Sequence, residues 1–372
     1  MVVAGLLLAA IIYVLPEETH AGSRSTIYWR GVLVVAMASF AVWVALSRFV
    51  VSARYNRLAT AQQWLIIGEP EVTADARHDF SRIRLGEQLV EMPVSSLECA
   101  DGAGADDIIM SRKWAGVVIA NRDDLSAAAV NRLMAARPAG VRIYDIFDFY
   151  ETFLLKVPVR FVHDQWLLLS HGFDLVHHNV QLRFKQVADL VIAFLLLVVT
   201  SPVMLLVALA VVVDSRGGII YAQERVGLNG RIFRIFKFRT MVPDAEKDGA
   251  RWAEAHDERI TRVGRFLRPS RLDELPQLWN VLRGDMSFIG PRPERPDFVQ
   301  ELEEQIPYFN LRVLVKPGIT GWAQVQYPYG ASVDDARQKL EYDLFYIKNY
   351  SILLDLAILF KTVRVVLFRS GR

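Results

Sequence analysis

Two long apolar runs open the chain. Residues 2–15 are wholly apolar but short for a membrane span, and residues 31–47 form a longer uncharged stretch flanked by aromatic residues. Runs of this kind predict transmembrane helices. Glu17 and Glu18 lie in the loop between the runs, whereas arginines follow the second run. By the positive-inside rule, we expect two transmembrane helices within residues 1–58 and a chain that continues on the cytoplasmic side.

Short apolar runs alternate with amphipathic stretches over residues 59–165. QWLIIGEP and AGVVIAN have the pattern of buried strands, and AAAVNRLMAARPAGVRIYDI has that of a helix followed by a strand. This alternation predicts a small, parallel, Rossmann-like α/β domain. The dinucleotide fingerprint G-x-G-x-x-G is missing, because Gly68 is followed by Glu69 and Pro70. We therefore expect a regulatory or scaffolding domain rather than a working nucleotide site.

A third apolar run contains 24 uncharged residues between Asp189 and Asp214. As a helix it would be about 36 Å long, enough to cross a hydrocarbon core of about 30 Å. Pro202 lies in its middle and removes a backbone donor, and Ser201 can satisfy the carbonyl that this frees. Each half is long enough for one leaflet only. We therefore predict a re-entrant membrane helix over residues 187–213, broken at Ser201 and Pro202, that returns to the face it entered.

The residues after this run carry most of the candidate chemistry. RIFRIFKFRTM alternates basic and apolar residues and predicts an amphipathic strand that displays Lys237 and Arg239. Further on, RLDELPQLWNVLRGDMSFIGPRPE places Asp273 and Glu274 ahead of Arg292. Adjacent helical side chains do not face each other, so each carboxylate needs a cation. Arg292, between two prolines, suits a phosphate clamp. A solvated edge strand and a plain rigid turn are the alternatives.

The last sixty residues offer weaker signals. VKPGITGWAQV predicts a tight backbone, either near a ligand or in a plain turn. The final thirty residues mix aromatic, aliphatic and basic residues at helical spacing, which suits a helix in the membrane interface or an ordinary core helix.

Composition narrows the classes of function. Hydrophobic residues make up 52% of the 372 residues, and the mean hydropathy of +0.22 indicates membrane segments. A formal net charge of +2 implies no broad basic surface, so nucleic acid is not an expected partner. Cys99 is the single cysteine, which excludes an intrachain disulfide and a thiolate metal cluster.

From about Arg183 to the C-terminus, the sequence resembles the bacterial sugar transferases that are monotopic phosphoglycosyl transferases. Transmembrane helices and an α/β domain ahead of this unit resemble the larger members. One departure is that Lys185 is followed by Gln186, where the family usually has Lys-Arg. The matching stretches occur in order: the Ser-Pro pair at 201–202, YAQERVGLNGRIFRIFKFRTM, DERITRVGRFLR, LDELPQLWNVLRGDMSFIGPRPE, VKPGITGWAQV and EYDLFYIKNYSILLDLAILFKTV.

The resemblance implies an α/β, membrane-associated chain with a mostly helical, monotopic catalytic domain over residues 180–372. It implies that Asp273 is a nucleophile and that Glu274, with Asp273, holds Mg²⁺. The residues expected to bind substrate or phosphate are Lys237, Arg239, Arg268, Arg292 and Asp343.

The implied reaction moves a sugar phosphate from a UDP-sugar to undecaprenyl phosphate and releases UMP, at the start of exopolysaccharide, capsule or O-antigen synthesis. We expect contact with membrane lipid, a place in the bacterial inner membrane with the catalytic domain on the cytoplasmic face, and chemistry within residues from about 180 onward. A homodimer is left open. The alternatives are an Mg²⁺-dependent nucleotide-sugar hydrolase and a non-catalytic scaffold of a polysaccharide assembly complex. No residue set identifies the sugar.

Overall fold

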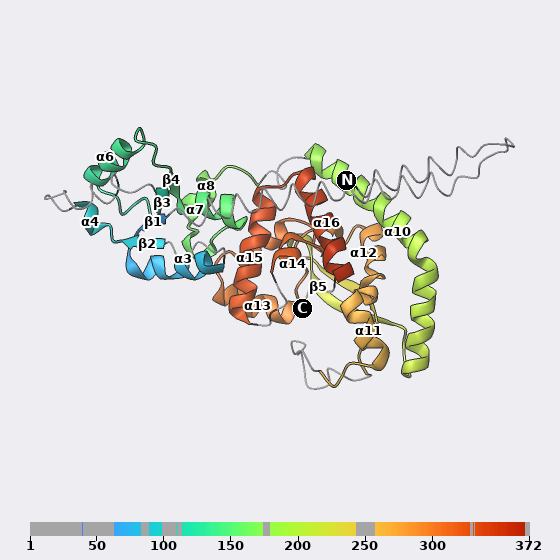
Figure 1. Cartoon of the computed structure of the whole chain (residues 1–372). Helices are drawn as coiled ribbons and strands as arrows, with labels where there is room; N and C mark the ends of the chain where they lie inside the picture. Colours follow the sequence, from blue (N-terminus) through green and yellow to red (C-terminus); the bar gives the residue numbers. More distant parts are fainter. Residues whose placement is uncertain are drawn as a thin grey trace. The chain divides into compact units, whose positions relative to one another are not determined.

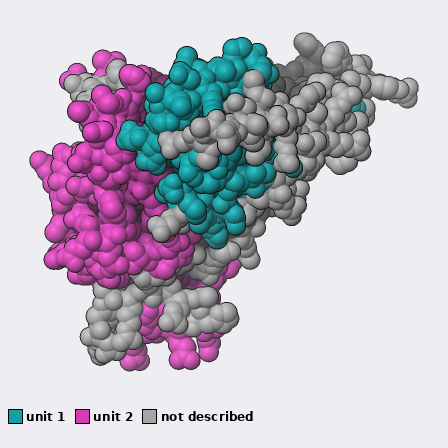
Figure 2. Space-filling view, turned by 90° about the vertical axis from the view of Figure 1, so that its left-hand side faces the viewer, with its two compact units in different colours: residues 1–145 teal, residues 146–372 magenta. Residues whose placement is uncertain are grey.

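A computed structural model describes residues 39, 63–82, 89–98, 109, 114–173, 179–242, 257–327, 330 and 332–368. Apart from Ser39, the two transmembrane helices predicted within residues 1–58 lie outside this part. The chain divides into two compact units, unit 1 (Met1–Asp145) and unit 2 (Ile146–Arg372), which Figure 2 distinguishes by colour.

The described residues of unit 1 form a parallel sheet of four strands in the order β2-β1-β3-β4. The predicted parallel α/β arrangement and the elements predicted from QWLIIGEP, AGVVIAN and the helix–strand segment are confirmed. The described elements are β1 (Gln63–Ile67), α3 (Pro70–Arg82), β2 (Leu89–Met92), α4 (Ser95–Glu98), β3 (Trp114–Ile119), α6 (Ala127–Ala136) and β4 (Ile143–Asp145).

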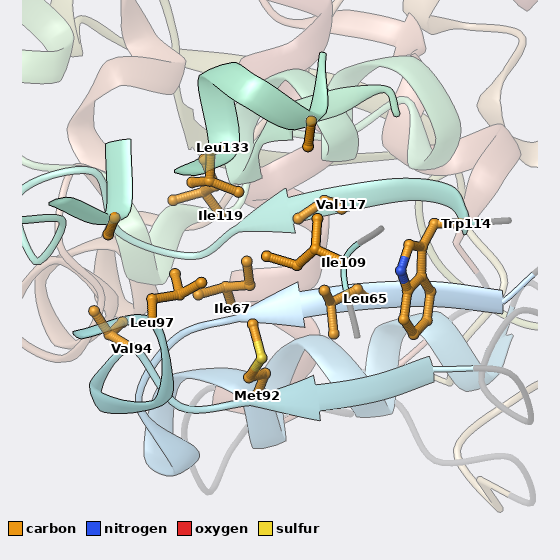
Figure 3. Close-up of a cluster of buried hydrophobic side chains, with 12 residues drawn as sticks. Leu65, Ile67, Met92, Val94, Leu97, Ile109, Trp114, Val117, Ile119 and Leu133 are labelled. Atoms are coloured by element: carbon orange, nitrogen blue, oxygen red, sulfur yellow. The ribbon is translucent and has the colours of Figure 1, made fainter. Parts of the chain in front are cut away.

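One buried apolar cluster of unit 1 lies on the α6 side of the sheet. Figure 3 shows Leu65 and Ile67 of β1 beside Val117 of β3, with Leu133 contributed by α6. Alternate strand residues point to the same face, which is why the apolar run of β1 supplies this layer. At the end of β1, a Cβ on Gly68 would lie 2.5 Å from that of Ala120. This glycine thus permits close packing of the turn on the end of β3, the place where doubly wound sheets commonly bind ligands.

In the described part of unit 2, helices combine with two small sheets, an antiparallel β5–β6 hairpin and a parallel β7–β8 pair. Its longer helices are labelled in Figure 1. The elements are α7 (Ile146–Phe149), the π-helix η2 (Tyr150–Leu154), the 3₁₀ helix η3 (Val159–Phe161), α8 (Asp164–Leu169), α10 (Asn179–Asp214), β5 (Ile220–Val226), the 3₁₀ turn η4 (Leu228–Gly230), β6 (Ile232–Phe238), α11 (Arg262–Ser270), the 3₁₀ turn η5 (Leu272–Glu274), α12 (Gln277–Arg283), β7 (Ser287–Ile289), α13 (Pro296–Gln305), the 3₁₀ helix η6 (Phe309–Leu314), β8 (Gly318–Thr320), α14 (Trp322–Gln326), α15 (Val333–Lys348) and α16 (Ile352–Phe368).

Helix α10 runs without interruption through the predicted break. It has 36 residues and contains Pro202, so the turn expected at Ser201 and Pro202 is replaced by helical backbone. Pro202 cannot donate to the carbonyl of Val198, and the Ser201 hydroxyl donates to that oxygen instead, at 2.8 Å. The expected role of Ser201 is therefore confirmed. Figure 1 shows the helix bending along its length, as expected of a helix with an internal proline.

Both halves of α10 pack on the rest of unit 2. Ala193 in the first half belongs to a core cluster with Ile235 and Leu278, and Val211 in the second half belongs to a cluster with Leu267. Figure 1 shows α11 and α12 beside the helix. Its other face is exposed and apolar, and among the described residues α10 is the one helix long and apolar enough to cross a membrane.

The boundary between the units lies after Asp145, earlier than the boundary at 165 expected from the sequence. Residues after Asp145 join unit 2 because they are bonded to it. The Val157 N–H donates to the Glu341 carbonyl at 2.9 Å. The buried Lys156 ammonium lies 2.7 Å from the Glu341 carboxylate and also donates to Gln338 at 3.0 Å.

Candidate active site

A sharp turn between α11 and η5 buries both adjacent carboxylates. Arg271 ends α11 in the left-handed conformation, with φ at 54°, and its N–H donates to the Arg268 carbonyl at 3.2 Å. Asp273 and Glu274 follow in the 3₁₀ turn and are both buried. A left-handed non-glycine residue is uncommon and costs conformational energy. Strain is therefore located directly before the acidic pair, where a functional constraint can account for it.

Three cations surround Glu274. The Lys237 ammonium and the Arg292 guanidinium contact the same oxygen, Oε1, at 2.9 and 2.8 Å, and Arg271 lies 3.8 Å from Oε2. Burial raises the pKa of Glu274, but the charges of Arg292, Lys237 and Arg271 outweigh it and hold this pKa well below the usual range. Glu274 is therefore an anion that keeps these cations together.

Asp273 has different surroundings. Burial, and then the negative charge of Glu274, raise the pKa of Asp273 to about 6, against the opposing charges of Lys237, Arg268 and Arg292. No hydrogen bond or ion pair with another described residue holds its carboxylate. It is thus an ionisable group next to a cluster of positive charge, with its oxygens available to a ligand.

Strand β6 brings Lys237 to this cluster. Lys237 shares a strand face with Phe233 and Ile235, which pack on α12, so it points into the unit rather than to solvent. The fully buried Asn280 of α12 fixes the strand. Its side chain accepts from the Phe236 N–H at 3.1 Å and donates to the Arg234 carbonyl at 2.7 Å.

Arg292 extends from the loop after β7. The Gly290 N–H donates to the Thr320 carbonyl of β8 at 2.9 Å, and a Cβ on Gly318 would lie 2.1 Å from the Gly290 nitrogen. The tight backbone predicted around Gly318 therefore exists, and it permits close strand pairing beneath the loop.

Not all of the remaining residues predicted to bind substrate lie at the Asp273–Glu274 pair. Arg268 lies close enough for its charge to lower the pKa of Asp273. The Arg239 guanidinium donates to the carbonyl and hydroxyl of Ser215, at 2.6 and 2.9 Å, so it fixes the end of α10. Asp343 is buried and pairs with Arg312 at 2.9 Å, which places it behind the Arg292 loop rather than in contact with the dyad.

A family model described as bacterial sugar transferase matches residues 180–369, the part of the chain that contains all of these groups. This chain belongs to the bacterial sugar transferase family.

Curated relatives are similar over the same region. A UDP-N-acetylgalactosamine-undecaprenyl-phosphate N-acetylgalactosaminephosphotransferase of Aeromonas hydrophila is 41% identical over 260 residues, which cover 70% of this chain and 60% of that protein. An undecaprenyl-phosphate glucose phosphotransferase of Komagataeibacter xylinus is 45% identical over 190 residues, 50% of this chain and 36% of that protein. A UDP-glucose:undecaprenyl-phosphate glucose-1-phosphate transferase of Caulobacter vibrioides is 43% identical over 203 residues, 54% of this chain and 75% of that protein. The chain thus spans only part of each of these relatives.

The donor set of this sugar transferase fits the Mg²⁺ ion that the resemblance implies. Asp273 and Glu274 offer only carboxylate oxygens, and the described residues include no group of three or more His, Cys, Asp and Glu side chains that could hold a metal. Mg²⁺ is commonly bound by one or two carboxylates together with substrate phosphates. On Glu274, Oε1 already meets two cations, whereas Oε2 has only the longer contact with Arg271.

Sequence reasoning missed three groups that shape this site. Arg271 lies two residues ahead of Asp273, but a lone arginine there carries no signal that its side chain turns back to the acidic pair. Asn280 is a polar residue inside the apolar helix motif LWNVL, and that position was its available signal. Arg312 had no local signal, because its partners Asp343 and Arg292 are distant in the sequence.

Proposed function

We propose that this sugar transferase moves a sugar 1-phosphate from a UDP-sugar to undecaprenyl phosphate, giving a polyprenyl-diphosphate-linked sugar and UMP. The activities by which the similar enzymes from Aeromonas, Komagataeibacter and Caulobacter are named support this class of reaction. The lipid-linked product would begin the synthesis of an exopolysaccharide, a capsule or an O-antigen.

One observation carries the proposal: a buried Asp–Glu pair inside a cluster of cations. Glu274 holds Lys237 and Arg292 within 2.9 Å of one oxygen, beside an Asp273 carboxylate with no described hydrogen-bond partner. A guanidinium fork and a lysine are the groups that bind and neutralise phosphate oxygens. A carboxylate can approach a phosphorus atom only where the phosphate charge is neutralised in this way.

The reaction would proceed in two displacements at one phosphorus atom. An Asp273 oxygen forms a bond with the sugar-bearing phosphorus while the bond from that phosphorus to the bridging oxygen breaks, and UMP leaves with this oxygen. An oxygen of undecaprenyl phosphate then attacks the same phosphorus, and the bond to Asp273 breaks. Lys237 and Arg292 would bind the phosphate oxygens throughout, and Arg271 and Arg268 add positive charge nearby. Bound Mg²⁺ on Glu274 and Asp273 would supply further neutralisation of phosphate charge.

We also propose that α10 lies in the cytoplasmic leaflet with both of its ends at the cytoplasmic surface. A transmembrane crossing would draw the core clusters around Ala193 and Val211, and the polar strands joined to them, into the bilayer. A helix lying in the leaflet instead buries its exposed apolar face in lipid. Leu353 and Phe360 of α16, 78% and 62% exposed, add apolar surface on the C-terminal helix.

Single cysteines at Gln186 and Arg216 test this topology in a Cys99→Ser background. With both ends of α10 in the cytoplasm, both cysteines should resist a maleimide that crosses only the outer membrane, until the inner membrane is opened. Labelling of the Arg216 position alone in intact cells would instead mean that α10 spans the membrane.

The reaction is tested by product analysis. The purified protein is incubated with a panel of UDP-sugars, with and without undecaprenyl phosphate, and UMP and lipid-linked sugar are measured. Transfer predicts equal amounts of UMP and lipid product with the acceptor, and at most one UMP per protein without it. Continuous release of UMP and free sugar phosphate without acceptor would establish the hydrolase. If no donor gives UMP, the remaining alternative is the non-catalytic scaffold of a polysaccharide assembly complex.

A further inference from the structure

The loop that carries Arg292 is held at four successive carbonyl oxygens. Each accepts a hydrogen bond from a different group outside the loop. The bonds run from the Gly318 N–H to Pro291 O (2.8 Å), from Arg312 Nη2 to Arg292 O (2.9 Å), from Arg225 Nη1 to Pro293 O (3.1 Å) and from the Val226 N–H to Glu294 O (3.0 Å).

The sequence of the loop explains why it needs donors from elsewhere. Pro291 and Pro293 have no N–H, so the loop cannot form a regular ladder with a neighbouring strand. Its carbonyls still require partners, because a buried carbonyl without a hydrogen-bond donor destabilises the fold. Two of the four partners are backbone N–H groups, and the other two are guanidinium groups.

The two guanidinium groups depend on two carboxylates. Arg312 is buried and forms its closest ion pair with Asp343, at 2.9 Å. Glu294 lies 3.9 Å from both Arg312 and Arg225 and joins them into one network. Burial lowers the pKa of Arg225 to about 10, with Glu294 acting in the opposite direction. A buried arginine without these acids would carry a large desolvation cost. The acids therefore keep the guanidinium groups of Arg312 and Arg225 in place.

Packing alone does not fix the loop. A cavity of about 20 Å³, large enough for one water molecule, lies behind it and is lined by Pro293, Glu294 and Arg312 among others. Space of this size allows the loop to shift when Arg312 or Arg225 no longer bonds to it. The Arg292 guanidinium would then move with the loop away from Glu274, which it contacts at 2.8 Å.

We propose that Arg312 and Arg225 are positioning residues, and that Asp343 and Glu294 are their counter-charges, which together set the Arg292 guanidinium at the phosphate site. The effect of this positioning on the transfer reaction rests on the proposed function. The contacts that position Arg292 do not depend on it. Asp343 thus has an indirect part, through Arg312, in place of direct binding of substrate.

A double-mutant cycle separates positioning from a merely structural role. Asp343→Asn and Arg225→Gln should each lower kcat/KM for the UDP-sugar by about 10- to 100-fold, the scale expected when a group is misplaced by about 1 Å. In an Arg292→Ala background, the same changes should cost less than about threefold, because the group they position is gone. Equal losses in both backgrounds would overturn the proposal. Arg160→Gln, which removes a surface arginine 3.9 Å from Asp334, is the matched control.

Hydrogen exchange of the full-length protein tests the loop without any turnover. Arg225→Gln and Asp343→Asn should speed exchange in peptides covering residues 290–295, whereas Arg160→Gln should not. Unchanged exchange in both variants would contradict the proposal. A wild-type protein that releases no UMP while its loop responds in this way would refute the proposed function and leave the positioning role intact.

Discussion

Asp273 and Glu274 are neighbours in sequence with opposite electrostatic surroundings. The pKa of Glu274 is held well below its usual range by three cations, whereas burial and the charge of Glu274 raise the pKa of Asp273 to about 6. Two carboxylates whose pKa values are pushed apart commonly have different roles. We assign Glu274 to holding cations and Asp273 to the reacting phosphorus.

Glu274→Gln tests the first of these roles. The amide would hold Lys237 and Arg292 less strongly, and we expect kcat/KM to fall by about 10² or more, equivalent to about 2.7 kcal/mol of barrier. Steady-state UMP release measures this effect. Glu301→Gln, on the exposed surface of α13, is the control and should have wild-type activity. A Glu274→Gln enzyme with near-normal activity would exclude the assigned role.

Arg312→Met should give a pH-dependent loss of stability. Burial raises the pKa of Asp343 to about 6, and Arg312 opposes that rise, so removing Arg312 raises the pKa further. A carboxyl with a raised folded-state pKa loses stabilisation as the pH rises through that range, because the folded state must give up a proton that it binds more tightly. The variant should therefore lose more stability at pH 8 than at pH 5, by about 1.4 kcal/mol per added pKa unit.

Denaturant unfolding at the two pH values measures this difference. Equal losses at pH 5 and pH 8 would show that Asp343 does not depend on Arg312 for its charge.

The sequence revealed residues with local signals and missed those that act over long distances. The Asp273–Glu274 pair, Lys237 and Arg292 stand in distinctive motifs, and the structure brings all four together. Arg239 and Asp343 stand in motifs just as distinctive, but their side chains bond elsewhere. A motif indicates that a residue matters and does not show where its side chain points.

At the scale of elements, β6 depends on a side chain for part of its hydrogen bonding. Asn280 satisfies one N–H and one carbonyl on the strand edge that β5 does not cover. Asn280→Ala should cost about 1–3 kcal/mol for each group left unsatisfied and should move the adjacent Lys237.

Thermal unfolding and kcat/KM together check this expectation. Both should fall for Asn280→Ala and neither for Asn310→Ala, at an exposed position of η6. An unchanged melting temperature for Asn280→Ala would contradict the role given to Asn280.

Helix α10 shows what an apolar pattern can and cannot predict. Its C-terminal end and the hydrogen bond from Ser201 followed from the sequence, whereas the helix begins at Asn179, eight residues before the predicted start. The continuous helix did not follow from the sequence, because the Ser201 hydroxyl satisfies the Val198 carbonyl that Pro202 leaves without an N–H donor. The Thr200 hydroxyl donates to Leu196 O at 2.6 Å, a bond of the kind that bends a helix without ending it. Local bonding outweighed the helix-breaking tendency of Pro202.

At the scale of the whole molecule, catalysis should belong to unit 2. A chain beginning at Ile146 should keep transferase activity in detergent, because every group assigned to the site lies within it. A chain beginning at residue 171 loses Lys156 and leaves Glu341 with Arg337, 3.1 Å away, as its described ionic partner.

Breaking a buried ion pair costs about 3–5 kcal/mol, so the shorter chain should melt roughly 10 °C below the longer one. Thermal unfolding of the two chains measures the difference. Equal melting temperatures would show that residues 146–170 do not stabilise unit 2, and a folded but inactive longer chain would give unit 1 a part in catalysis.

The most direct test of the central claim is the mass of the intact protein after mixing with its UDP-sugar alone. If Asp273 carries the phosphosugar, the wild-type protein should gain the mass of one sugar phosphate and lose it again when undecaprenyl phosphate is added. Asp273→Asn should gain nothing and release no UMP. An Asp273→Asn protein that transfers sugar phosphate at a near-normal rate would contradict the account.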